Sequence, residues 1–129
     1  MGVDGTIYLA FRNNTAADSE YDFYIMKSND DGATFSTPVR VNSTDSKSHW
    51  IYDFTVDASD NIHFVWAYAK SDSAAGGSVY YCNSTDGGTT FSTPISLYSS
   101  SSGWGEGGSG PSVTTDSDDN IYVLWSTGV

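Results

Sequence analysis

The chain has 129 residues and is poor in cysteine, in basic residues and in long apolar runs. Its single cysteine, Cys82, excludes an internal disulfide framework, and we expect it to be a small buried residue. Five Lys and Arg residues against sixteen Asp and Glu residues give a formal net charge of −11. So few cations cannot form the basic stripe that a nucleic-acid partner needs. No apolar run approaches the roughly 20 residues that span a bilayer, so we expect no membrane insertion.

Aromatic residues, by contrast, make up 15% of the chain, and this favours a folded protein because disordered acidic chains are poor in them. The length corresponds to one domain. The first residues show neither a charged segment nor an apolar core of a signal peptide. Because Ser, Thr, Gly, Asn and Asp dominate, we predict an extracellular or cell-surface protein, or a piece excised from one.

The chain repeats itself, and the repeats predict its fold. Residues 28–38 (SNDDGATFSTP) return 56 positions later at 84–94 (STDGGTTFSTP). A second motif, with an Ile-Tyr or Ile-His pair and a terminal Phe or Trp, occurs at residues 6–11, 61–66 and 120–125. A fixed period with small drift is typical of repeated supersecondary units that are joined by variable loops.

Within each repeat the pattern is that of β-strands, because short runs of Ile, Val, Tyr, Phe and Trp lie between clusters of turn-forming residues. We call the four successive strands of a repeat A, B, C and D. The pattern predicts strand A at residues 50–56 and 111–115, strand B at the three copies of the second motif, strand C at 22–27 and 78–83, and strand D at 34–41 and 90–97. Asp and Asn at 57–61 and 116–120 predict tight turns between A and B.

Four antiparallel strands in a unit of about 50 residues are the signature of a β-propeller blade. The order B-C-D, A-B-C-D, A-B therefore predicts an all-β fold with two blades plus one surplus strand, in a single module, residues 1–129. Its blade units are 1–49, which lacks its first strand, 50–110, and the partial unit 111–129.

Blades bury their faces against neighbouring blades, so we expect aromatic residues that recur at one repeat position to fill the space between them. These residues are Phe11, Trp66, Trp125, Phe35 and Phe91. Two blades alone would leave apolar faces and strand edges exposed. We therefore predict that identical chains complete one another as a homo-oligomer.

Residues 28–35 and 84–91 resemble the Asp-box, Ser/Thr-x-Asp-x-Gly-x-Thr-Trp/Phe, of the bacterial-neuraminidase (BNR) repeat, so the chain resembles part of a sialidase-like β-propeller. The matching residues are Ser28, Asp30, Gly32, Thr34, Phe35, Ser84, Asp86, Gly88, Thr90 and Phe91. In that family the box is a structural turn on the perimeter, which implies no catalytic role for its aspartates. The residues themselves indicate the same, because glycine permits positive φ and short polar side chains bond loop backbone.

Sialidases of that family use three arginines, a Tyr–Glu pair and an Asp, whereas this chain contains two arginines. Arg12 lies in a segment that partly resembles the family's Phe/Tyr-Arg-Ile-Pro, and we expect Arg40 to be solvated. His49 and His63 lack metal-ligand spacing to a second His or Cys, and we interpret His63 as an aromatic substitute for tyrosine. No catalytic residue is predicted, and the chain is interpreted as a non-enzyme unless an oligomer pools several copies of Arg12.

Three functions remain open at this point. The first is a non-catalytic scaffold that self-associates head to tail, in a closed ring or a filament. The second is a carbohydrate-binding module that uses Trp50, Tyr68, Trp104 and Arg12. The third is a fragment of a sialidase-type hydrolase.

Two further kinds of site are considered. Asp57, Asp116 and Asp118 present oxygens at alternate positions, as in a calcium loop, but the glycine that such a loop needs at its sixth position is missing. Turn chemistry accounts for them without an ion, and no cofactor is predicted. Sequons at Asn13, Asn42 and Asn83 are candidates for N-glycosylation, and the first two are expected on surface loops.

Overall fold

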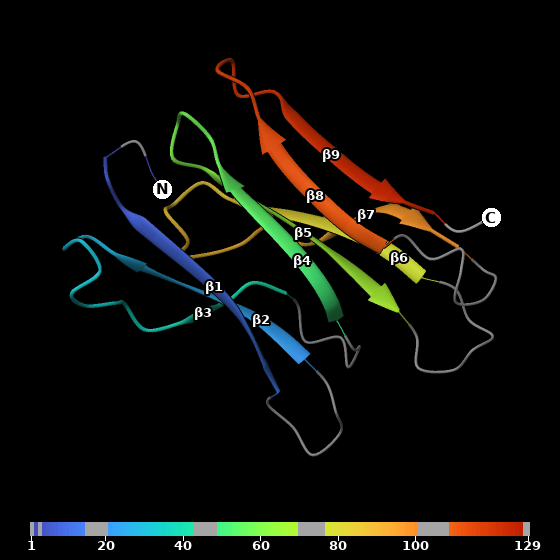
Figure 1. Cartoon of the computed structure of the whole chain (residues 1–129), viewed down its shortest axis with the longest axis horizontal. Coiled ribbons are helices and arrows are strands. Elements are labelled where there is room, and N and C mark those ends of the chain that lie inside the picture. The colour runs from blue at the N-terminus through green and yellow to red at the C-terminus, as the bar shows by residue number, and fades with distance from the viewer. Residues whose placement is uncertain are drawn as a thin grey trace.

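The computed structural model describes residues 2, 4–14, 21–42, 49–69, 77–100 and 109–127, and these form nine strands and no helix. The strands are β1 (Ile7–Asn14), β2 (Tyr21–Ser28), β3 (Val39–Arg40), β4 (His49–Val56), β5 (Ile62–Ala69), β6 (Gly77–Ser84), β7 (Ile95–Ser99), β8 (Ser109–Thr115) and β9 (Ile121–Ser126) (Figure 1). No helix that could cross a membrane occurs in this part of the chain. The all-β prediction is confirmed.

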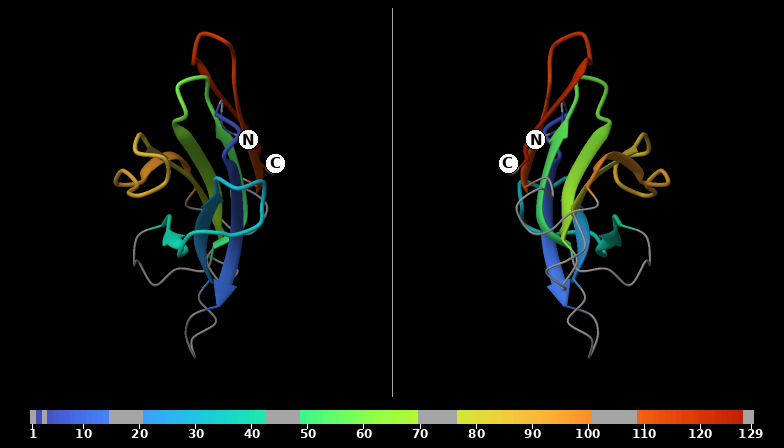
Figure 2. Two further views of the ribbon diagram at one scale, coloured as in Figure 1. Left: turned by 90° about the vertical axis from the view of Figure 1, so that its left-hand side faces the viewer. Right: turned by 90° about the vertical axis from the view of Figure 1, so that its right-hand side faces the viewer.

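The strands form three antiparallel sheets in which neighbours along the chain are neighbours in space. Sheet 1 has the order β1-β2-β3, sheet 2 the order β4-β5-β6-β7, and sheet 3 pairs β8 with β9. The three sheets follow one another across Figure 1 from lower left to upper right. In Figure 2, β3 and β7 lie on the same side of the long strands β1, β4 and β8. The predicted order of three, four and two strands is confirmed.

The prediction for strand D is wrong in its first half, because residues 34–38 and 90–94 lie outside the strands and only β3 and β7 pair. Each non-strand segment ends in proline, which has no N–H to donate. In each segment a serine hydroxyl accepts a backbone hydrogen bond that a strand carbonyl would otherwise accept. The Ser36 N–H donates to the Lys27 carbonyl (2.9 Å), and the Lys27 N–H donates to Ser36 Oγ (3.1 Å). The same pair of bonds joins Ser92 and Asn83 in the next repeat.

The hydrophobic core lies between sheets 1 and 2. Phe23 and Ile25 of β2 cluster with Ile62, Phe64 and Trp66 of β5, and the exposed fraction of each is 2% or less. Because successive side chains of a strand alternate between faces, His63 and Val65 lie on the other face of sheet 2, toward sheet 3.

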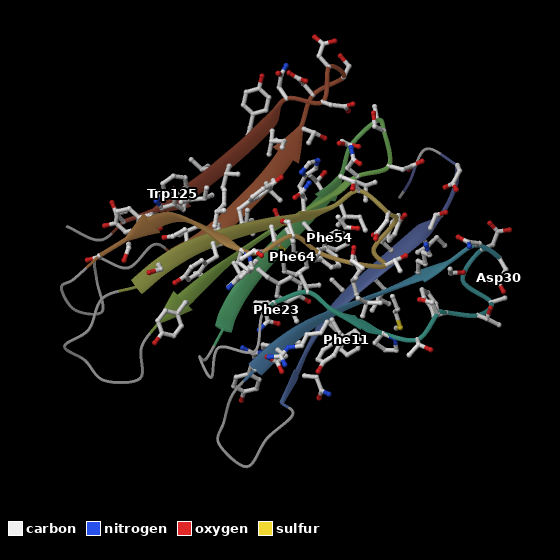
Figure 3. The ribbon with its side chains drawn as sticks, turned by 180° about the vertical axis from the view of Figure 1, so that it is seen from behind. Phe11, Phe23, Asp30, Phe54, Phe64 and Trp125 are labelled. Atoms are coloured by element: carbon white, nitrogen blue, oxygen red, sulfur yellow. The ribbon has the colours of Figure 1, made fainter. Side chains whose placement is uncertain are left out.

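Aromatic rings make up most of this core. The Phe64 ring stacks on Tyr52 with 5.3 Å between centroids and 9° between planes, and lies 5.6 Å from Phe23. It also lies within 6.2 Å of Phe54 and Trp66. Figure 3 shows Phe23, Phe54 and Phe64 together where the ribbons of sheets 1 and 2 cross.

The other aromatics that were predicted to fill the spaces between units differ in their surroundings. Phe91 packs against the core, but Phe35 is 38% exposed, so the prediction for Phe35 is wrong. Phe11 stacks on Tyr24 within sheet 1 (5.7 Å). Trp125 lies beside Tyr98 of β7 (6.3 Å).

Candidate functional site

Two equivalent loops follow β2 and β6, loop 1 (residues 28–35) and loop 2 (residues 84–91). In loop 1, Ser28 Oγ donates to Asp30 Oδ1 (2.7 Å) and accepts the Gly32 N–H (2.9 Å). The Asp30 carboxylate then accepts the Thr34 N–H (2.8 Å) and the Thr34 hydroxyl (2.6 Å). Gly32 has φ +86°, a conformation that glycine adopts without strain.

Loop 2 repeats these contacts almost atom for atom. Ser84 Oγ donates to Asp86 (2.7 Å) and accepts the Gly88 N–H (2.9 Å), and Asp86 accepts both the N–H and the hydroxyl of Thr90 (2.9 and 2.6 Å). Its glycines, Gly87 and Gly88, both have positive φ. Each loop is therefore held by its own serine and aspartate.

These hydrogen bonds favour the charged form of each aspartate. The bonds from the Thr34 side chain and backbone lower the pKa of Asp30 to about 2. The corresponding bonds from Thr90 lower the pKa of Asp86 still further. Both carboxylates therefore serve as anionic acceptors inside their own loops, and neither is placed to transfer a proton at neutral pH.

A small cavity separates sheet 1 from loop 2. Its volume is about 320 Å³, and Tyr8, Ile25, Lys27 and Val39 are among its lining residues. Lys27 Nζ donates to the carbonyl of Gly87 (2.9 Å) and so joins the two sides. The cavity opens at the junction between sheets. Its wall is mostly apolar, and its Lys27 ammonium group is hydrogen-bonded to the Gly87 carbonyl.

Loop 2 approaches its neighbours so closely that its glycines are required. A Cβ on Gly88 would lie 3.1 Å from Ile62 Cδ1, and a Cβ on Gly87 would lie 3.1 Å from Lys27 Nζ. A Cβ on Gly32, the equivalent of Gly88 in loop 1, would meet Ile7 only at 3.8 Å. Loop 2 is thus packed into a junction between sheets, whereas loop 1 is not.

A second recurring feature is a turn that precedes β1, β5 and β9. We call these turns turn 1 (residues 2–6), turn 2 (residues 57–61) and turn 3 (residues 116–120). In each turn the first N–H donates to the last carbonyl, at 2.8, 3.0 and 3.1 Å. The fourth residue has positive φ in all three, +88° at Gly5, 60° at Asp60 and 62° at Asp119. Asp and Asn tolerate this conformation better than other non-glycine residues.

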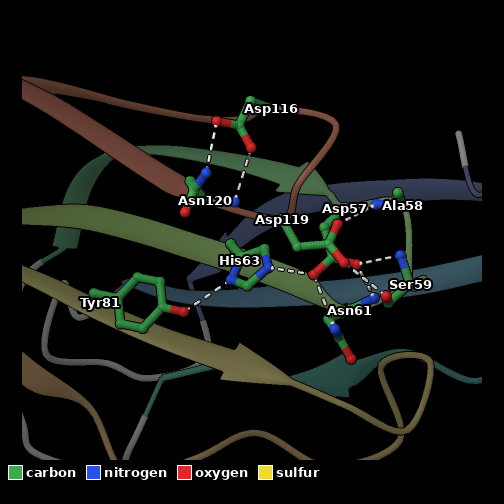
Figure 4. Close-up of polar contacts among 9 residues, drawn as sticks. All are labelled: Asp57, Ala58, Ser59, Asn61, His63, Tyr81, Asp116, Asp119 and Asn120. Atoms are coloured by element: carbon green, nitrogen blue, oxygen red, sulfur yellow. Dashed lines mark hydrogen bonds and ion pairs between the residues drawn. The ribbon is translucent and has the colours of Figure 1, made fainter.

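Side chains join the turns of adjacent sheets. Asp119 of turn 3 accepts the Ala58 N–H (2.9 Å) and the Ser59 hydroxyl (2.7 Å) of turn 2, as Figure 4 shows. Asp60 of turn 2 lies against turn 1, since its Oδ1 is 2.7 Å from the place where a Gly2 Cβ would be. Turns 2 and 3 thus each place their fourth residue on the turn of the preceding sheet.

Sheets 2 and 3 are joined at a second point. The Asp53 carboxylate on β4 accepts the Ser112 hydroxyl (2.8 Å) and the Val113 N–H (3.0 Å) of β8. On the opposite face of β4, the Tyr52 hydroxyl donates to the Ala10 carbonyl of β1 (3.0 Å). The first strand of sheet 2 therefore bonds both neighbouring sheets.

A buried polar chain lies beside turn 2. Asp57 and His63, each 4% exposed, are joined at 2.9 Å from Oδ2 to Nε2, and His63 Nδ1 lies 2.8 Å from the Tyr81 hydroxyl (Figure 4). Burial raises the pKa of Asp57, but hydrogen bonds from His63, Asn61 and Ser59 outweigh it and the net effect is a lowered pKa. Because a carboxylate can only accept, Nε2 donates to Asp57, and in the neutral tautomer that this bond favours Nδ1 accepts from the Tyr81 hydroxyl.

His63 is therefore more than the aromatic substitute that the sequence predicts, since both of its ring nitrogens are bonded. In turn 3 the same arrangement is simpler, because Tyr122 stands at the His63 position and donates directly to Asp116 (2.9 Å). The recurrence of an aspartate six residues before this aromatic position was the signal in the sequence that could have revealed it.

The turn aspartates are occupied by their own turns. Asp57 Oδ1 accepts the N–H groups of Ser59 and Asn61, and Asp116 Oδ1 accepts those of Asp118 and Asn120. The bonds from Asn120 lower the pKa of Asp116 to about 2. In the described part of the chain, His, Cys, Asp and Glu do not gather into a group of three or more that could hold a metal ion. Turn hydrogen bonds thus use the carboxylates of Asp57 and Asp116, two of the three residues of the calcium hypothesis.

The two arginines lie on opposite faces of sheet 1. Arg12 pairs across the sheet with Phe23 and is exposed, with its guanidinium 4.1 Å from the centroid of the Tyr21 ring. Arg40 pairs with Tyr24 on the other face and forms an ion pair with Asp22 (2.5 Å). The expectation that Arg40 is solvated is wrong, because its side chain is 31% exposed and bonded.

The structure describes the side chains of two of the four predicted ligand-binding residues, Arg12 and Tyr68. Tyr68 is half-buried on β5, in sheet 2, and Arg12 belongs to sheet 1. The side chain of Trp50 and the whole of Trp104 lie outside the described residues.

One of the glycosylation candidates is buried. Asn42 is 4% exposed; its amide donates to Asp22 (3.0 Å) and its oxygen accepts the Phe23 N–H (2.8 Å), so the expected surface loop is wrong there. The Asn42 side chain instead bonds to β2 just beyond the end of β3. Asn13 is exposed, on β1, and Asn83 is half-buried, on β6.

Comparison with known proteins shows a fold and not a family. No family model and no curated protein matches this sequence. A protein of unknown function from Dyadobacter fermentans DSM 18053 has a similar structure, with a TM-score of 0.71, 16% identity, and coverage of 96% of this chain and 31% of that chain. The Hadza microbial sialidase Hz136 matches with a TM-score of 0.62, 18% identity, and coverage of 74% of this chain and 24% of that chain. The chain has a sialidase-like fold and spans a third or less of the length of these two structures.

Proposed function

We propose that the chain is a non-catalytic β-propeller scaffold in which the three sheets are blades and the outer faces bind further copies head to tail. The observation that carries the proposal is the repetition of one junction. Sheet 2 packs on sheet 1 and sheet 3 packs on sheet 2, and at both junctions the fourth residue of the later turn lies on the earlier turn. A contact made twice in succession along one chain is one that a further unit can make again.

The outer face of sheet 1 is one half of the proposed interface. Leu9 on β1 is 38% exposed, whereas Phe64, at the equivalent position of β5, is fully buried against sheet 1. Phe11, half-buried, stands at the position of Trp66. Sheet 1 therefore presents the apolar face that sheet 2 buries in its own junction.

The outer face of sheet 3 is the other half. Tyr122 and Leu124 on β9 are 55% and 74% exposed. Their equivalents on β5, His63 and Val65, are 4% and 0% exposed because sheet 3 covers them. The two outer faces are different surfaces, so their contact is heterologous, and repeated copies would close into a ring or extend into a filament.

Three features support a non-catalytic role. The aspartates of both loops are bonded within those loops, and the turn aspartates are bonded to their own turns. The two arginines face opposite sides of sheet 1, so one chain does not bring them together on a substrate carboxylate. The buried His63 is held on both sides and bonds to sheet 2 only.

A pair of face variants tests the association. Leu9→Asp blocks one face and Leu124→Asp blocks the other, and Thr93→Asp adds the same charge at an exposed loop position as a control. By sedimentation velocity we expect each face variant alone to be monomeric and the control to associate like the natural chain. An equimolar mixture of the two face variants retains one intact pair of faces and should form a dimer. If the mixture stays monomeric, or if only one variant affects assembly, head-to-tail association is wrong.

A further inference from the structure

The fourth residue of each turn is the point at which a sheet attaches to its predecessor, and sheet 1 differs from the others there. Asp119 bonds turn 2 through both carboxylate oxygens, and Asp60 lies against turn 1. Turn 1 carries Gly5 at that position, with φ +88° and open space where a Cβ would be. Turn 1 therefore has no side chain at the position that Asp60 and Asp119 occupy in turns 2 and 3.

The receiving half of the contact also differs between turns. Turn 2 offers the Ala58 N–H and the Ser59 hydroxyl, and Asp119 accepts from both. The equivalent residues of turn 3 are Ser117 and Asp118, both exposed. The turn's own hydrogen bonds to Asp116 come from the N–H groups of Asp118 and Asn120, and so they use neither the Ser117 N–H nor the Asp118 carboxylate. Turn 3 therefore presents the Ser117 N–H, a hydrogen-bond donor, beside the Asp118 carboxylate.

We propose that Ser117 and Asp118 receive the turn of a following copy, and that the fitting residue at its fourth position is an amide and not a carboxylate. This inference rests on the head-to-tail association proposed above. An asparagine there would accept the Ser117 N–H with Oδ1 and donate to Asp118 with Nδ2. An aspartate would place two carboxylates together on a chain that already carries a net charge of −11. Gly5 supplies neither group, so in the natural chain turn 1 lies against Ser117 and Asp118 without this side-chain bond.

The backbone of turn 1 is already suited to such a residue. Asp60 and Asp119 have φ 60° and 62° at the same position, so a short polar side chain fits this turn geometry. Asparagine is among the residues that adopt this region most readily. Asparagine or aspartate at position 5 therefore tests the proposed contact in a turn geometry that Asp60 and Asp119 already adopt.

The preference for an amide is tested first inside the chain, where association is not needed. Ser59→Asp gives turn 2 the receiving residue of turn 3. We expect Asp119→Asn to change the thermal midpoint little in the natural background, because Ser59 can either donate or accept. In the Ser59→Asp background we expect Asp119→Asn to raise the midpoint by about 2–5 °C. Equal effects in both backgrounds would overturn the inference.

The second arm measures association directly. We expect Gly5→Asn to tighten head-to-tail association roughly tenfold, the effect of one to two added hydrogen bonds, and Gly5→Asp to give no gain. Gly5→Ala is the control for the side chain alone. Adding Asp118→Ser should reverse the preference so that Gly5→Asp becomes the tighter variant. If the first arm succeeds and Gly5→Asn does not tighten association, the preference for an amide stands but turn 1 of a second copy is not its partner, and this part of the inference is overturned; the face variants test the head-to-tail association separately.

Discussion

Replacing Phe64 by alanine tests whether packing between sheets 1 and 2 holds the fold together. Phe64 is fully buried, and its ring contacts those of Phe23, Tyr52, Phe54 and Trp66 at centroid distances of 5.3 to 6.2 Å. Removing a buried phenylalanine typically costs about 3–5 kcal/mol, because burial is lost and a cavity remains. Since the free energy of unfolding of a single domain is about 5–15 kcal/mol, we expect a folded but strongly destabilised variant.

The matched control is Leu9→Ala, at the equivalent strand position of sheet 1. Leu9 is 38% exposed and no described residue of another sheet covers it, so we expect a cost of about 1 kcal/mol. Urea unfolding, followed by tryptophan fluorescence at a concentration low enough to keep the chain monomeric, gives both values. The packing argument is refuted if the loss of unfolding free energy in Phe64→Ala exceeds the loss in Leu9→Ala by less than about 1 kcal/mol.

Four further outcomes are expected. The pKa of Asp30 is about 2 in the folded chain, below its ordinary value of 3.8. The charged Asp30 therefore stabilises the fold above pH 4, and this stabilisation is lost as the pH falls toward 2. In Asp30→Asn, the thermal midpoint should decrease less between pH 4 and pH 2 than in the natural chain. Gly88→Ala should lower the thermal midpoint more than Gly32→Ala, because both have positive φ but only the first Cβ would meet a neighbour at 3.1 Å; equal shifts would contradict the packed junction. Burial raises the pKa of Cys82 to about 12, so its thiol should resist a disulfide reagent until urea unfolds the chain, and rapid labelling of the native protein would contradict its burial. A fluorogenic sialoside should not be hydrolysed above the rate of the buffer, and turnover that Arg12→Ala abolishes would overturn the non-catalytic proposal.

The strand order was predictable because the sequence repeats. Three copies of one motif and two copies of another fixed where β1, β5 and β9 fall and which strands follow them. The boundary of β3 was not predictable from residue type, since Thr34, Phe35 and Thr37 are residues that strands favour. The structure ends the pairing there because a serine hydroxyl replaces a backbone acceptor and a proline follows.

The contacts between sheets were not predictable from the sequence. The bonds of Asp53 and Asp119 join residues about 60 positions apart, and neither carries a local signature. The burial of Asn42 depends on the position of Asp22 in the neighbouring strand, which a sequon does not reveal. The repeat does indicate the bond of His63 to Asp57, because the aspartate recurs at a constant distance before the strand.

The natural chain's mass in solution is the most direct test of the scaffold proposal. Light scattering after size exclusion, over a dilution series from high to low micromolar concentration, reports whether the exposed faces of β1 and β9 bind copies. The proposal predicts masses that are multiples of 13.8 kDa and decrease on dilution. A mass of one chain at every concentration would contradict it.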